Sequence, residues 1–222
     1  MDLANIIQTI AIYAIPVLFA ITVHEAAHGY VARHYGDNTA WMLGRVTLNP
    51  LKHIDPLGTI LMPLFLYIAT SGAFLFGYAK PVPVRFDRLR HPKRDMISVA
   101  LAGPASNLIQ ALLWGALLYV LLGLCVSEPF FLQMCKGGVL VNIVMFAFNL
   151  FPLPPLDGGR VLAGLLPRHA ANALSRVEPY GFFIVMALVV TGIVSSLWMR
   201  PLMNATYGLL EVLLTPLKLL FS

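Results

Sequence analysis

The residues best suited to chemistry are two histidines and a glutamate in the segment T-V-H-E-A-A-H-G, residues 22–29. Residues four positions apart share one face of an α-helix, so His24 and His28 could direct their imidazoles at one tetrahedral Zn²⁺. Glu25 lies beside them and could accept and return a proton, as metal-assisted hydrolysis requires. The H-E-x-x-H pattern also arises by chance, so a third ligand is needed to support this interpretation.

The helix expected to carry this motif is unusually apolar. Residues 6–23 contain almost no polar side chains, so the motif should lie where the helix is still inside the hydrocarbon of a membrane. Ionisable side chains at that depth are costly and are retained mainly for function. The setting therefore strengthens the interpretation of His24, Glu25 and His28 as a reaction centre.

The composition excludes a soluble globular domain. Hydrophobic residues make up 59% of the 222 residues and charged residues 11%, whereas charged residues approach roughly a quarter of a typical soluble chain. We therefore expect an all-α polytopic membrane protein. The net charge of +5 comes from basic residues in the loops, which indicates membrane topology and gives no sign of nucleic-acid binding.

Six apolar segments divide the chain, and no repeat or second domain separates them. We expect one membrane-embedded domain over residues 1–222, with a catalytic core at about 3–166 and accessory helices at about 177–222. The segments are 3–32, 56–76, 96–124, 137–156, 179–198 and 202–221.

Asp157 is the best candidate for the third ligand. It ends a long apolar run and is framed by prolines before it and glycines after it. Such breakers unwind the backbone, and non-helical backbone at membrane depth is tolerated where it is buried in protein or lines a watery cavity. An Asp before Gly-Gly could instead cap the following short helix. The ligand role is favoured, because a catalytic zinc site usually has three protein ligands and one open position.

Topology tests this assignment independently. If all six segments crossed the membrane, the histidines and Asp157 would face opposite sides. If the segment from Pro56 to about Val84 re-enters instead, the three ligands meet at one depth. Re-entry also leaves only Lys136 and Arg200 of the 15 basic residues on the other side, which the positive-inside rule prefers.

The re-entrant arrangement predicts five crossing helices, an external N-terminus and a zinc site toward the cytoplasmic side. The proline-spaced sequence Lys80-Pro81-Val82-Pro83-Val84 belongs to the re-entrant, partly extended segment. It would suit a strand edge that holds an unwound substrate.

Taken together, H-E-A-A-H at 24–28, Gly103-Pro104 with Asn107, and the sequence from Asn149 to Asp157-Gly158 resemble the site-2 protease family of intramembrane zinc metalloproteases. The resemblance covers roughly residues 15–165 and is closest to small prokaryotic members without PDZ or CBS domains. It implies a three-helix catalytic core formed by segments 3–32, 96–124 and 137–156.

The resemblance also implies one zinc per chain on His24, His28 and Asp157, and cleavage of membrane-spanning proteins within or near the bilayer. The expected partners are transmembrane protein or peptide substrates and the lipid bilayer, in the cell (cytoplasmic or inner) membrane. The oligomeric state stays open.

Three asparagines could stabilise the oxyanion or hold the substrate backbone. Asn149 is the first choice, by resemblance and because an amide in an apolar helix needs a partner. For Asn107 and Asn142, an interhelical hydrogen bond is the favoured role. Cys125 and Cys135 flank one loop and could pair or remain free.

Two other functions would also use intramembrane histidines and carboxylates. A divalent metal transporter would explain the ligands but leave Glu25 without a proton-transfer role. A non-proteolytic membrane scaffold would explain neither the ligands nor the glutamate.

Overall fold

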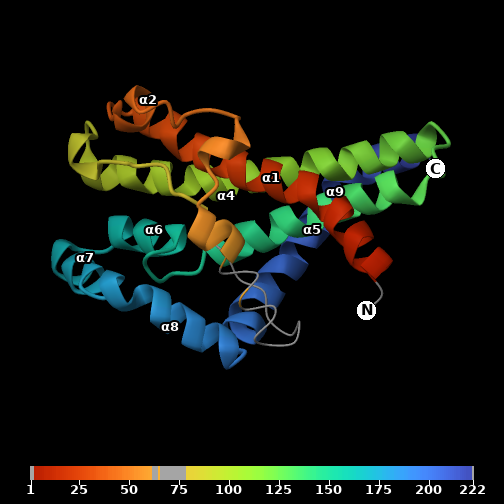
Figure 1. Cartoon of the computed structure of the whole chain (residues 1–222). Helices are drawn as coiled ribbons and strands as arrows, with labels where there is room; N and C mark the ends of the chain where they lie inside the picture. Colours follow the sequence, from red (N-terminus) through yellow and green to blue (C-terminus); the bar gives the residue numbers. More distant parts are fainter. Residues whose placement is uncertain (1–2, 62–64, 66–78, 222) are drawn as a thin grey trace.

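The computed structural model describes residues 3–61, 65 and 79–221, and every regular element within them is a helix (Figure 1). The long helices are α1 (Leu3–His34), α4 (Pro92–Gly123), α5 (Pro129–Asn149) and α9 (Arg200–Phe221). The shorter ones are α2 (Thr39–Met42), η1 (Pro50–Lys52), η2 (Pro56–Leu61), η3 (Phe86–Arg88), α6 (Asp157–Leu165), α7 (Arg168–Ser175), α8 (Glu178–Val190) and η4 (Ser195–Met199). The predicted all-α class is confirmed.

The long helices lie side by side as a bundle, with α6, α7 and α8 grouped toward one end (Figure 1). Helices α1 and α5 run in the same direction and α4 runs in the opposite direction, and each of the three contacts the other two (Figure 1). The C-terminal end of α1 therefore lies near the C-terminal end of α5 and the start of α6. This arrangement brings the histidine motif and Asp157 to the same end of the bundle.

Prolines account for the bounds of α5, which the sequence had placed at 137–156. The helix begins eight residues earlier, with Pro129 at its first position, where a missing N–H costs nothing. It ends at Asn149, three residues before Pro152, because a proline and the residue before it disfavour helical backbone. Residues 150–156 then form turns and bends that lead directly into α6.

Small residues allow the bundle helices to approach closely. A Cβ atom added to Gly138 of α5 would lie 2.4 Å from the indole of Trp114 in α4. One added to Gly115 of α4 would lie 2.5 Å from Leu214 of α9. Helices in a membrane gain stability from such close packing because lipid offers no hydrophobic driving force between them.

Three helices of the described part are long and apolar enough to cross a membrane: Ile7–His34, Pro92–Gly123 and Pro129–Asn149. Helices α7 and α8 meet at a bend of 70° and would form a fourth span if counted as one. Helix α9 carries Arg200, Glu211 and Lys218 and is not among the three. Membrane association is supported, and five crossings stay a prediction.

The predicted re-entrant segment lies partly outside the described residues, which omit 62–64 and 66–78. Its described portion begins with the π-helix η2 and resumes at Ala79, and residues 79–85 have no regular secondary structure. The predicted strand edge at 80–84 is therefore not observed. One physical reason is that Pro81 and Pro83 have no N–H to donate to a ladder. Cys125 is exposed, Cys135 is buried, and both thiols are free.

Candidate metal centre

Three potential ligand atoms converge at the predicted site. The Nε2 atoms of His24 and His28 lie 3.0 Å apart. The Oδ2 atom of Asp157 lies 3.2 Å from the first and 3.3 Å from the second. The three residues are buried, with exposed fractions of 4%, 8% and 7%. The structure thus brings together the three side chains that the sequence analysis selected from two distant segments.

The hydrogen bond that each histidine makes through Nδ1 determines which of its ring nitrogens is unprotonated. Nδ1 of His24 lies 2.6 Å from Oδ1 of Asn107, and Nδ1 of His28 lies 2.7 Å from the carbonyl oxygen of Val99. Both oxygens only accept, so each Nδ1 must carry the hydrogen and donate. Each Nε2 then presents its lone pair to the centre, as a neutral metal-ligating histidine does.

The donor set fits a divalent metal. Two imidazole lone pairs and one carboxylate oxygen face each other at close range, and Oδ2 of Asp157 is buried without a hydrogen-bond donor among the described residues. Acceptors held this close repel each other unless a cation lies between them. Bonds of about 2.0–2.2 Å would separate the donor atoms of a tetrahedral zinc by roughly 3.3–3.6 Å, close to the observed distances. The set leaves one coordination position open.

The turn between α5 and α6 positions the carboxylate. Asp157 is the first residue of α6, rather than the residue before it, and its side chain faces the two histidines instead of capping the helix. A Cβ at Gly158 would lie 2.1 Å from the carbonyl oxygen of Leu150, and one at Gly159 would lie 2.2 Å from the backbone nitrogen of Pro154. The two glycines therefore let α6 start directly against the preceding turn.

Gly103 of α4 packs directly against the two imidazoles. A Cβ atom there would lie 2.3 Å from Nε2 of His28 and 2.6 Å from Nε2 of His24. Only a residue without a side chain leaves room for the rings to face Asp157. The sequence analysis included Gly103 in the family resemblance but did not identify this contact.

Glu25 faces residues 79–85, an irregular segment that precedes η3 and α4. Its Oε2 accepts a 2.7 Å hydrogen bond from the backbone N–H of Val82. Arg45 donates to the carbonyl oxygen of Lys80 at 2.9 Å, and the N–H of Lys80 donates to the carbonyl of His53 at 2.9 Å. Hydrogen bonds to Glu25, Arg45 and His53 therefore hold residues 80–82 in place. Two hydrogen bonds were not predicted from the sequence: the one from Val82 to Glu25 and the one from His28 to Val99. In both, the valine takes part through its backbone.

A second carboxylate fixes the same segment at the end of α1. Asp37 accepts hydrogen bonds from the N–H and the hydroxyl of Thr39, at 2.9 and 2.5 Å, and from the N–H of Arg85, at 2.6 Å. Burial acts to raise the pKa of Asp37, but these hydrogen bonds outweigh it and hold the pKa below its usual value. An ionised Asp37 thus joins the loop after α1 to residues 79–91.

The three asparagines differ in their contacts. Asn107 accepts from His24 and donates to Oδ1 of Asn142 at 2.9 Å and to the carbonyl of Ala20 at 3.3 Å. It therefore makes the expected interhelical hydrogen bonds and also orients a histidine. Asn149 donates to the carbonyl of Met145 in its own helix at 3.0 Å. The chemical role of Asn149, like the ligand roles of His24, His28 and Asp157 and the proton-transfer role of Glu25, stays a prediction.

Comparisons with known proteins agree with this chemistry. The family model described as peptidase family M50 matches residues 126–192, which include α5, the turn after it and Asp157. YwhC of Bacillus subtilis, named a candidate zinc metalloprotease, is 41% identical over 198 residues, which are 86% of this chain and 85% of that protein. No solved structure matches the chain.

More distant relatives carry names of the same kind. Rip2 of Mycolicibacterium smegmatis is 31% identical over 179 residues, or 78% of this chain and 64% of that protein. MJ0611 of Methanocaldococcus jannaschii is 30% identical over 144 residues, or 63% of this chain and 62% of that protein. Both are named candidate zinc metalloproteases. On the extent and identity of these matches, the chain belongs to peptidase family M50, the site-2 proteases, and is a membrane zinc metalloprotease.

Proposed function

We propose that this protein is an intramembrane endopeptidase that hydrolyses peptide bonds of membrane-spanning substrates within or near the bilayer. His24, His28 and Asp157 would hold one zinc ion, and Glu25 would transfer the proton. The observation that carries the proposal is the convergence of two Nε2 lone pairs and a carboxylate oxygen at separations of 3.0–3.3 Å. That centre lies inside a bundle whose surrounding helices are long and apolar enough to span a membrane.

Each residue has a distinct task in this mechanism. Bound zinc supplies a Lewis acid and lowers the pKa of water to about 7. Glu25 accepts the proton of the attacking water and later delivers it to the leaving amine. The N–H of Val82, 2.7 Å from Oε2 of Glu25, holds this carboxylate in place. Asn107 and the carbonyl of Val99 fix the tautomers and orientations of the two imidazoles.

The substrate must present an unwound segment, because a helix engages its carbonyl groups in internal hydrogen bonds. We therefore expect substrates with helix-breaking residues near the cleaved bond. Asn149, at the C-terminal end of α5, is proposed to contact the substrate backbone or the developing oxyanion.

The proposed topology has five crossings in the cell membrane, an external N-terminus and the zinc site toward the cytoplasm. The parallel course of α1 and α5 supports it (Figure 1). This topology would also leave 13 of the 15 basic residues on one side, as the positive-inside rule favours. Residues 1–222 would form one protease domain, with α8 and α9 as accessory helices.

The test is metal content and cleavage of single-span membrane substrates by the full chain in detergent. We expect about one zinc per chain in the wild type and in Glu25→Gln, and loss of zinc in Asp157→Ala, because zinc needs three protein ligands. Only the wild type should cleave. Glu211→Gln, an exposed glutamate of α9, is the matched control and should cleave normally.

Two outcomes would contradict this proposal. Zinc and activity retained in Asp157→Ala would remove the carboxylate from the ligand set. Cleavage by Glu25→Gln at the wild-type rate would remove Glu25 from proton transfer and would reopen the transporter interpretation.

A further inference from the structure

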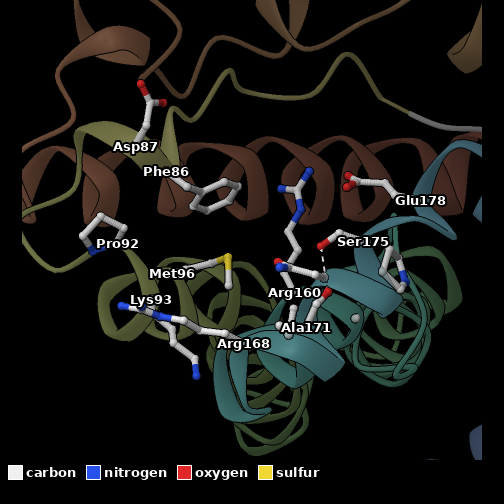
Figure 2. A pocket seen from close by; sticks show the side chains of 14 residues that line it. Phe86, Asp87, Pro92, Lys93, Met96, Arg160, Arg168, Ala171, Ser175 and Glu178 are labelled. Atoms are coloured by element: carbon white, nitrogen blue, oxygen red, sulfur yellow. Dashed lines mark hydrogen bonds between the residues drawn. The ribbon is translucent and has the colours of Figure 1, made fainter.

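A cavity whose lining includes none of the three proposed metal ligands lies between the start of α4, helices α6 and α7, and the first residue of α8. Its volume is about 540 Å³. The three basic side chains around it come from three different helices (Figure 2): Lys93 from α4, Arg160 from α6 and Arg168 from α7. Phe86, Met96 and alanine side chains form its apolar lining. The cavity therefore combines apolar walls with several cations.

The basic groups of this cavity keep hydrogen-bonding capacity for a ligand. Within the described part of the chain, no ion pair of 4.0 Å or less joins Lys93, Arg160 or Arg168 to a carboxylate. Arg160 is half-buried and its guanidinium lies 5.2 Å from the ring centre of Phe86. Lys93 uses one N–H on the carbonyl of Leu166 at 2.5 Å. An ammonium has three donors and a guanidinium has five.

Two carboxylates also line the cavity and reduce its positive charge. Asp87 already forms an ion pair with Arg85 at 3.0 Å. Glu178, the first residue of α8, is exposed. With both counted, the lining still carries one net positive charge, from three basic and two acidic residues. The cavity can therefore accept a single compact anion.

The contrast between the polar helix α7 and the apolar helix α8 favours a position near the lipid headgroups for this cavity. Helix α7 carries Arg168 and His169 and meets the apolar helix α8 at a bend of 70°, so we expect α7 to lie near the membrane surface, where α8 enters the apolar phase. Large apolar side chains of the neighbouring helices are exposed: Leu165 at the end of α6, and Tyr180 and Phe183 on α8. A ligand bound here would thus meet cations at one end and an apolar helix surface at the other.

We propose that this cavity binds the phosphate group of an anionic phospholipid, whose acyl chains lie along α8. Lipid phosphate is favoured over an acidic peptide because it joins one compact anion to a long apolar body. Arginine and lysine supply charge-assisted hydrogen bonds to phosphate oxygens. Arg160 lies one helical turn after Asp157 in α6, so an occupied cavity would also hold the helix that carries this proposed zinc ligand.

The test measures lipid binding to the full chain in detergent by native mass spectrometry. Phosphatidylglycerol and phosphatidylcholine with identical acyl chains are compared. We expect Arg160→Gln/Arg168→Gln to weaken phosphatidylglycerol binding by about tenfold, because two charge-assisted hydrogen-bonding groups are lost. Phosphatidylcholine, whose choline group offsets the charge of its phosphate, should bind more weakly and lose less affinity in the double variant. Arg160→Lys should recover part of the affinity.

The matched control is Arg176→Gln/Arg200→Gln, which removes the same charge outside the cavity and should bind as the wild type does. Thermal unfolding in detergent checks that each variant folds. Glu25→Gln should bind lipid normally, so a failure of the protease proposal would not affect this measurement.

Three results would overturn the proposal. Equal phosphatidylglycerol binding by the two double variants would mean that the lipid does not use the cavity. Binding of inorganic phosphate, dependent on Arg160, without binding of phosphatidylglycerol would indicate a free anion as the ligand. Displacement of the lipid by a lower concentration of an Asp-rich peptide would indicate a peptide site.

Discussion

Polar side chains in the metal-centre region bond mainly between helices, whereas those in the C-terminal helices bond mainly to backbone a few residues away. In the first region, His24 of α1 bonds to Asn107 of α4, which bonds to Asn142 of α5. In the second, Thr206 of α9 donates to the carbonyl four residues before it in the same helix, at 2.8 Å. The exposed Thr191, Ser196 and Thr215 each donate to the carbonyl four residues before them.

This difference indicates what each region requires. Side chains that bond across helices fix the rotation and position of one helix relative to the next, as a metal site needs. The C-terminal helices dock mainly through apolar contacts, such as those of Leu210 and Leu214 with Ala111 and Ile143. The indole N–H of Trp198, which donates to the carbonyl of Ala147 at 2.9 Å, is an interhelical exception. Apolar packing tolerates small shifts that a metal centre does not.

The largest expected effect is that of Gly103→Ala. The new methyl group would lie 2.3–2.6 Å from the two imidazoles, and helix packing gives it no space to move away. We expect zinc content below about a tenth of the wild-type value and no measurable cleavage, because both histidines lose their position. Metal analysis and a cleavage assay measure these effects.

Gly208→Ala in α9 is the matched control, because nothing lies within 4 Å of the added Cβ. It should keep its zinc and its activity. Normal zinc binding by Gly103→Ala would contradict the close approach of α4 to the histidines and would weaken the contrast between the two regions.

The next largest effect is expected from Asn107→Ala. Nδ1 of His24 would lose its acceptor, and loss of such an outer partner lowers metal affinity by about 10–100-fold. Asn107→Asp keeps an oxygen acceptor and should recover part of that loss. Competition with a zinc chelator measures the affinity. Equal affinities for wild type and Asn107→Ala would show that the interhelical hydrogen bond does not orient the ligand.

Val82→Pro tests the backbone contact of Glu25. Proline removes the N–H that donates to Oε2 at 2.7 Å, whereas Val82→Ala keeps it. We expect Val82→Pro to lower kcat by roughly tenfold relative to Val82→Ala, with zinc content unchanged and KM changed less. Steady-state kinetics on one substrate measures the difference. If Val82→Pro and Val82→Ala had the same kcat, the hydrogen bond from the backbone N–H to Glu25 would not contribute to catalysis.

The smallest effect is expected from Thr206→Val in α9. The lost hydrogen bond lies within one helix, and the threonine hydroxyl mainly competes with the backbone there. We expect the free energy of unfolding in detergent to change by less than about 1 kcal/mol, with zinc content and cleavage unchanged. A large loss of zinc in Thr206→Val would mean that α9 positions the metal centre and that the two regions are not distinct.

Several features were predicted from the sequence because their causes are local. The apolar segments predicted helices at α1, α4, α8 and α9 to within a few residues at most ends. The spacing of His24 and His28 predicted a shared helix face, and the breakers around Asp157 marked where the chain turns. The start of α5 was missed because residues 129–136 mix aromatic, polar and charged side chains, so an apolar run begins only at Gly137.

The contacts that complete the centre depend on the tertiary structure. Val99 accepts through its backbone carbonyl, which any residue could supply, and Val82 donates through its backbone N–H, which any residue except proline could supply. The residue types at these two positions therefore did not indicate the contacts. Asn107 bonds to His24, which is 83 positions away in the sequence. Whether Asn107 could contact a substrate or orient a histidine depended on which helix its side chain faces. The sequence by itself determined which side chains could hold a metal, and helix packing decided which groups orient them.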